Sequence, residues 1–244
     1  WPGPYRNKGT GRKGGGMEGK KDLSKKTLGI IHASHITIQA MEPYIRQFIP
    51  EVEIMHLCDD TIQRDNIKAG AGVIPKVNYF KFAQYAHNLE EAGVDLILLA
   101  CSTFNYAAEL GRPLVNTPIA QIDRPMMEKA VRTGKKIGLL ATLATTVPSS
   151  ERLLDIAAAE AGAEIERKTL LCSEAFEEYS KGNIERHNEI LVDAIDKLSE
   201  DVDCIVMAQL SMSALAPFLK DTKVPVYNSG ETGFLRVREM LEEM

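Results

Sequence analysis

The sequence lacks the local motifs that mark several large classes of enzyme. It contains no Walker loop, no Gly-x-Ser-x-Gly elbow, no metal-binding helix and no pair of acidic residues at catalytic spacing. These absences favour simple proton chemistry over hydrolysis or phosphoryl transfer. They also predict neither a metal site nor a cofactor-binding motif.

Cysteine is scarce, and its spacing fits neither a disulfide framework nor a zinc site. The residues are Cys58, Cys101, Cys172 and Cys204, without a CxxC pair or an accompanying histidine pattern. In a chain of 244 residues this favours reduced thiols and a cytoplasmic location. No apolar run has membrane-spanning length and no signal-peptide core is evident, so we expect no membrane partner.

Charge is modest overall but uneven along the chain. The formal net charge of -5 gives no reason to expect a nucleic-acid partner. Residues 1–26 hold eight Lys and Arg against Glu18 and Asp22, and they are rich in Gly and Pro. We interpret them as a flexible basic extension, foreign to the protein or upstream of a start at Met17, and a basic arm touching nucleic acid is the alternative. The GxGxxG formed there by Gly9, Gly11 and Gly14 follows no strand and is attributed to chance.

From residue 27 onward, short apolar runs alternate with helical stretches. Strands are predicted at 27–33, 51–58, 94–101, 135–141, around 163–172 and at 202–208, and helices at 38–49, 77–93, 149–162 and 183–200. Ser149 or Ser150 is the expected cap of the third of these helices, and Gly162 is expected to end it. This alternation predicts parallel sheets joined by helical crossovers.

The second half of the chain repeats the first. GVDLILLACSTFN (93–105) matches DVDCIVMAQLSMS (201–213) at an offset of 108, LGIIHAS matches IGLLATL at 109, and TPI matches VPV at 107. A fourth match, HLCDD with LLCSE, has an offset of 114. We therefore predict an α/β protein of two similar lobes related by pseudo-twofold symmetry, with lobes at 27–125 and 126–225 and residues 226–244 returning to the first lobe.

In parallel α/β folds, ligands bind beyond the carboxyl ends of the strands. Two such lobes facing each other would enclose one cleft, lined by the residues that follow the strands. Those residues are rich in hydroxyls and poor in charge, which suits a small carboxylate held by N–H and O–H donors. The predicted substrate-binding residues are His32, Ser34, Ser102, Thr103, Thr142, Thr145, Thr146 and Ser211.

Cys101, at the end of LLACSTFN, is the predicted catalytic thiol. A strand ending in Ala-Cys-Ser-Thr and repeated about 110 residues later resembles the aspartate/glutamate/hydantoin racemase superfamily, and IGLLATLATTVPS resembles its second Thr-rich loop. The resemblance covers roughly residues 27–230.

The resemblance implies an enzyme independent of pyridoxal phosphate and of other cofactors. In the racemases of that superfamily, one thiol removes the proton α to a carboxylate and a second thiol returns one to the opposite face. The superfamily that this chain resembles also includes arylmalonate decarboxylase and maleate cis-trans isomerase, so the resemblance does not fix the reaction.

The second thiol of that family is missing here. The family pattern is Gly-Cys-Thr, whereas this chain reads Ala208-Gln209-Leu210, and an amide cannot titrate. Three alternatives follow: Cys172 supplies a displaced thiol; Cys101 acts alone in a lyase or isomerase, with Gln209 donating a hydrogen bond; or the protein binds a small acid without turnover. For Cys172 itself, the favoured interpretation is a buried packing role.

The remaining polar candidates have simpler interpretations. His87 and His187 lie on predicted helices and are read as surface or packing residues. Asp123 precedes a helix, so an N-cap explains it and substrate contact is the alternative. A homodimer is a common state for such folds, and the sequence leaves the oligomeric state open.

Overall fold

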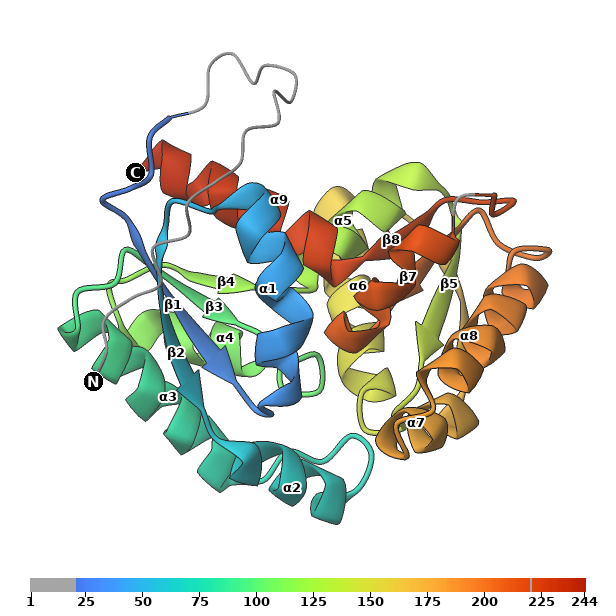
Figure 1. Ribbon diagram of the computed structural model, residues 1–244, viewed down its shortest axis with the longest axis horizontal. Coiled ribbons are helices and arrows are strands. Elements are labelled where there is room, and N and C mark those ends of the chain that lie inside the picture. The colour runs from blue at the N-terminus through green and yellow to red at the C-terminus, as the bar shows by residue number, and fades with distance from the viewer. Residues whose placement is uncertain (1–20, 220) are drawn as a thin grey trace.

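Two four-stranded parallel sheets form the framework of the protein (Figure 1). The computed structural model describes residues 21–219 and 221–244. The interpretations of Gly9, Gly11 and Gly14 and of most of the basic extension therefore lie outside the described residues. The strand orders are β2-β1-β3-β4 and β6-β5-β7-β8, so the two sheets have the same topology. The predicted α/β fold of two similar lobes is confirmed.

The first sheet and its connections run in chain order from residue 27 to residue 133. The elements are β1 Thr27–His32, α1 Ile36–Phe48, β2 Glu53–Cys58, α2 Asp60–Ala69, α3 Lys76–Glu91, β3 Leu96–Leu99, α4 Ala107–Gly111, the 3-10 turn η1 Arg112–Leu114, β4 Ile119–Gln121 and α5 Arg124–Thr133. β3 is apolar and buried along its whole length, and β1 is buried from Leu28 to His32, because helices cover both faces of the sheet.

The second sheet repeats this order. Its elements are β5 Lys136–Ala141, α6 Val147–Ala161, β6 Glu166–Leu171, α7 Ser173–Ser180, α8 Ile184–Leu198, β7 Cys204–Met207, the 3-10 helix η2 Leu210–Phe218, β8 Val226–Asn228 and α9 Ser229–Glu243. Gly162 ends α6 in a left-handed conformation (φ 61°), as the sequence predicts. No helix in the described part of the chain has the length and apolar character needed to cross a membrane.

The ladder registers place Gln209 at the position equivalent to Cys101. Leu28 pairs with Leu96 in the first sheet, and Ile137 pairs with Cys204 in the second, which gives offsets of 109 and 108. The outer strands differ from the expectation by one residue, because His32 pairs with Cys58 whereas Ala141 pairs with Leu171. The counterpart of Cys172 is therefore Asp59 rather than Cys58, and both residues precede a helix.

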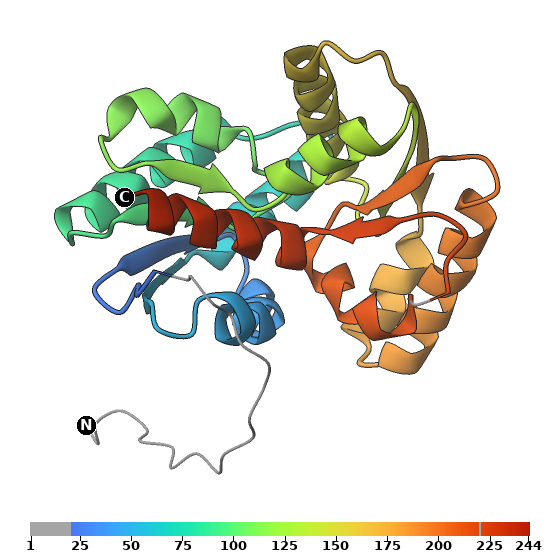
Figure 2. The ribbon, with the colours of Figure 1, turned by 90° about the horizontal axis from the view of Figure 1, so that it is seen from above.

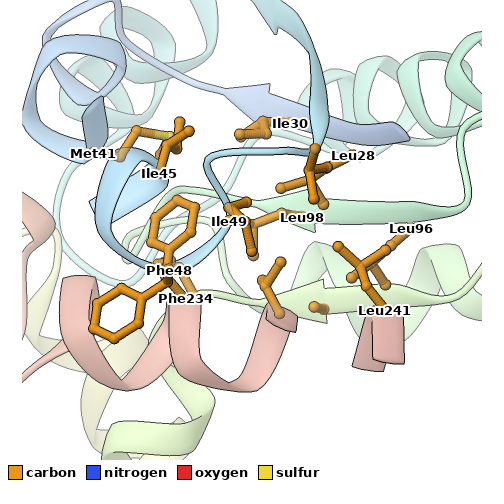
Figure 3. Close-up of a cluster of buried hydrophobic side chains, with 14 of the residues drawn as sticks. Leu28, Ile30, Met41, Ile45, Phe48, Ile49, Leu96, Leu98, Phe234 and Leu241 are labelled. Atoms are coloured by element: carbon orange, nitrogen blue, oxygen red, sulfur yellow. The ribbon is translucent and has the colours of Figure 1, made fainter. Parts of the chain in front are cut away.

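The last helix of each lobe covers the other lobe's sheet. α5 follows β4 but packs against the second sheet, where Met126, Met127 and Ala130 join the core of β5 and α6. α9 follows β8 but packs with α1 on the first sheet through Phe234, Val237 and Leu241 (Figure 3). In Figure 2 this red helix runs from the second lobe across the first. The lobes are thus interlocked, and each completes the other's hydrophobic core.

Two local expectations are wrong. The N-cap of α6 is Thr146, with no side-chain cap bond, so neither Ser149 nor Ser150 caps it. The helix starts earlier because Pro148 occupies one of its first two positions, where a missing N–H costs nothing. The extension also ends sooner than residue 26, since Leu23 is only 2% exposed and lies in the core with α1 and α9.

Candidate active site between the lobes

The segments that follow β1, β3, β5 and β7 meet in one cavity between the lobes. Its volume is about 80 Å³. The first lobe contributes Ser34, Thr37, Cys101, Ser102 and Thr103, and the second contributes Thr142, Thr146, Gln209, Ser211 and the α7–α8 residues Phe176, Tyr179 and His187. No Lys, Arg, Asp or Glu side chain belongs to this lining. An anion here would be held by hydroxyl and N–H donors.

Eight of the predicted site residues are brought together at this cavity. They are Cys101, Gln209, Ser34, Ser102, Thr103, Thr142, Thr146 and Ser211. Thr145 instead lines a neighbouring hollow between the lobes with Tyr106 and Arg152. Cys172 packs on the apolar side of the second sheet, against the core of α8 and β7, and is not part of the cavity lining. The displaced second thiol is therefore not brought to the site.

His32 is fully buried behind the cavity and does not line it. The Thr37 hydroxyl donates to the Ser34 carbonyl at 2.7 Å, so it accepts from Nδ1 of His32, also at 2.7 Å. Nε2 of His32 lies 2.9 Å from Nδ1 of His56 and must accept from it. Burial and the neighbouring His56 ring lower the pKa of His32 to about 3. This neutral imidazole holds the Thr37 hydroxyl in place. His32 therefore does not contact the cavity as predicted, but supports a residue that lines it.

The Cys101 thiol is held in its protonated form. It follows β3 and lies next to the backbone N–H groups of Thr103 and Phe104, which lower its pKa slightly. Desolvation outweighs them, and the carboxylate of Asp123 adds to it, so the pKa of Cys101 rises to about 12. A thiol of this kind donates a proton to a carbanion and is not a standing nucleophile at neutral pH.

Asp123 is a further functional candidate, which the sequence analysis interprets as an N-cap with substrate contact as the alternative; it is not part of the cavity lining. It occupies the N-cap position of α5, but its side chain makes no cap bond. It is fully buried, and neither carboxylate oxygen completes a hydrogen bond of normal geometry. Burial raises its pKa to about 6, with the hydroxyls of Ser102 and Ser229 acting in the opposite direction. The register of β3 with β4, in which Leu99 pairs with Gln121, gives Asp123 and Cys101 matching positions beyond neighbouring strand ends.

Gln209 is anchored through its side-chain oxygen. Oε1 accepts from the backbone N–H of Thr142 at 2.6 Å, from the Thr142 hydroxyl at 3.0 Å and from the Leu143 N–H at 3.3 Å. Two backbone donors fix which end of the amide is the oxygen. The NH₂ group is therefore left as the donor that can serve the cavity, and the Thr-rich loop is tied to the end of β7.

Three contacts between the lobes close the cleft beside Cys101, and we call them the latch. The hydroxyls of Thr103 and Thr146 lie 3.0 Å apart, and the Ser149 hydroxyl donates to Asn105 at 3.1 Å. The Arg152 guanidinium stacks 3.6 Å over the ring of Tyr106. The cavity beside the latch has a volume of about 80 Å³, so a substrate must be small. A larger molecule would enter only when the lobes separate.

The arrangement defines a class: a pseudosymmetric α/β protein with one closed, uncharged, thiol-bearing site between duplicated lobes. The chain belongs to the Asp/Glu/hydantoin racemase family, whose model matches residues 31–235. That membership supports an enzyme of the racemase and isomerase type. No curated protein matches the chain at a significant level.

Solved structures of the same fold support this placement. A glutamate racemase from Bacillus anthracis superposes with a TM-score of 0.66 at 15% identity, covering 90% of this chain and 83% of that one. An allantoin racemase from Klebsiella pneumoniae gives 0.63 at 18% identity, with 88% and 87% covered. An aspartate racemase from Picrophilus torridus gives 0.64 at 17% identity, with 88% and 94% covered. At these identities the likeness concerns the fold.

Proposed function

We propose that the protein is a cofactor-independent isomerase that moves a proton at the carbon α to a carboxylate or an equivalent carbonyl. Cys101 is the proton donor of this reaction. The observation that carries the proposal is the Cys101 thiol in a small cavity between the lobes, lined by hydroxyl and N–H groups without a charged side chain. Such a cavity suits a carbanion that must be protected from water.

The lining assigns roles to the remaining groups. The hydroxyls of Ser34 and Ser102 and the NH₂ group of Gln209 would bind the carboxylate and stabilise the enediolate that forms when the α-proton leaves. The α-proton would pass to solvent water, Cys101 would deliver its thiol proton to the α-carbon, and the resulting thiolate would recover a proton from the solvent. Atoms and charge balance without a cofactor.

A lyase that releases carbon dioxide is the second candidate, and Gln209 is the observation that favours it. Its amide stands where the family has the second thiol, so one thiol proton donor faces the cavity. After decarboxylation, the electron pair of the broken C–C bond stays on the α-carbon, and a single donor suffices to protonate it. The product would carry the new proton on one face only.

Incubation with amino acids, hydantoins and substituted malonates in D₂O distinguishes these functions. Deuterium at the α-carbon together with loss of chirality, read by NMR and chiral chromatography, is the expected result for the isomerase. Carbon dioxide release with deuteration on one face would instead establish the lyase. Absence of turnover with an acid that raises the melting temperature would overturn both and leave a binding protein.

A further inference from the structure

The cavity lining contains a second group able to carry a proton, contributed by the lobe that does not hold Cys101. His187 lies on α8 of the second lobe and is 4% exposed, with its ring turned to the cavity lining. The titratable side chains of that lining are Cys101, Tyr179 and His187. A phenol ordinarily keeps its proton at neutral pH, whereas a neutral imidazole can accept one. His187 is therefore the one side chain of the lining suited to act as a base.

The hydrogen bonding of His187 sets its tautomer. Nδ1 lies 2.9 Å from Oδ1 of Asn188, and since an amide oxygen can only accept, Nδ1 carries the proton. Nε2 is then the unprotonated nitrogen. No described residue forms a hydrogen bond with Nε2, and this atom is not among the polar atoms that are both buried and without a hydrogen-bond partner. Its lone pair is free to accept a proton from a molecule in the cavity.

Aromatic side chains hold the imidazole in place. The ring of Tyr179 packs against it with centroids 5.2 Å apart at 55°, and Phe176, one turn earlier on α7, also lines the cavity. The apolar face of α8, including Leu191, anchors the helix in the second core. The imidazole and the thiol thus belong to different lobes and meet the cavity from different sides.

We propose that His187 replaces the missing second thiol and is the acid/base that serves the second-lobe face of the substrate. Nε2 takes the α-proton from one face, and the Cys101 thiol gives its proton to the other. The enzyme is left with an imidazolium and a thiolate, which is the state that processes the opposite enantiomer. This inference deepens the proposed isomerase and rests on it.

Exchange in D₂O with His187→Gln tests the assignment. Wild type should exchange the α-proton of both enantiomers, and His187→Gln should lose racemisation by at least about a hundredfold. Cys101→Ser should still exchange the enantiomer whose α-proton faces His187, because the imidazole remains as the base, and His187→Gln should lose that exchange. The exposed His87 on α3 provides the control, His87→Gln. Retention of that exchange by His187→Gln, or its loss in a folded Cys101→Ser protein, would overturn the proposal.

A measurement that needs no turnover separates this inference from the proposed function. ¹⁵N NMR of the histidine rings should show His187 with its proton on Nδ1, and malonate should shift its Nε2 signal. An Nε2–H tautomer, or a signal indifferent to every acid that raises the melting temperature, would overturn the role of His187. If wild type exchanges no α-proton in the panel, the proposed isomerase itself fails, whatever the tautomer.

Discussion

At the scale of single residues, the site depends on the burial of two titratable groups, the Cys101 thiol and the Asp123 carboxyl. Desolvation raises the pKa of the Cys101 thiol, and the buried carboxylate of Asp123 beside it raises that pKa further. A buried carboxylate without hydrogen bonds is costly to the fold, so its presence indicates a function rather than a packing need. The sequence could not reveal this, because an Asp before a helix has the same pattern as an ordinary N-cap.

Asp123→Asn should stabilise the protein at neutral pH. The native pKa of about 6 lies above the ordinary 3.8, so the folded state binds its proton more tightly and loses stability as pH rises between these values. The free energy of unfolding of wild type should lie about 3 kcal/mol below that of Asp123→Asn above pH 6, and this difference should vanish below pH 4. Urea unfolding from pH 4 to 7.5 measures it.

The exposed carboxyl of Asp193 on α8 provides the matched control, Asp193→Asn. A difference between wild type and Asp123→Asn that stays constant with pH would show that the carboxyl is not buried as the structure has it. Asp123→Asn should also speed alkylation of Cys101, because it removes the negative charge that raises the thiol's pKa.

At the scale of secondary-structure elements, the sequence predicts the regular parts well and the special positions poorly. The apolar run around β3 and the 108-residue repeat place Cys101 and Gln209 at equivalent strand ends, because parallel strands share one carboxyl edge. The role of His187 is not predictable in this way. It lies on a helix far along the chain, and only the packing of α7 and α8 brings it to the cavity.

α9 packs closely against Ile122, the residue that follows β4, at the position of Gly233. A Cβ on Gly233 would lie 2.7 Å from the carbonyl oxygen of Ile122 and 2.6 Å from its Cδ1. Gly→Ala inside a helix usually stabilises by about 0.5–1 kcal/mol. Here the clash with backbone should reverse the sign, and Gly233→Ala should lower the free energy of unfolding by about 1–3 kcal/mol.

Chemical denaturation of Gly233→Ala, beside Glu239→Ala on the exposed face of the same helix, measures the effect. The control should change stability by no more than about 0.5 kcal/mol. A stabilised Gly233→Ala protein would mean that α9 does not approach β4 this closely.

At the scale of the whole molecule, the exchanged helices and the latch have different consequences. α5 and α9 tie the lobes into one unit, whereas the latch joins the lobes beside the cavity. A site of about 80 Å³ between two lobes admits a larger molecule only when the lobes separate. Latch contacts should therefore control access.

Removing two latch groups should expose Cys101. Arg152→Leu combined with Ser149→Ala deletes the stacking on Tyr106 and the hydrogen bond to Asn105. Together these are worth about 1–1.5 kcal/mol, so alkylation of Cys101 by iodoacetamide should accelerate about fivefold to tenfold. Mass spectrometry resolves the thiols, and Arg186→Leu on the surface of α8 is the control. An unchanged rate would show that the latch does not limit opening.

The central claim is that the Cys101 thiol transfers the proton at the α-carbon. The most direct test is the rate of racemisation of the acid that wild type turns over fastest, compared between Cys101→Ser and Cys58→Ser. Cys58 is an exposed thiol outside the cavity lining. Cys101→Ser should bring racemisation down by at least about a hundredfold while Cys58→Ser keeps the wild-type rate. A folded Cys101→Ser protein that racemises this acid within about twofold of wild type, against that hundredfold expectation, would contradict the account.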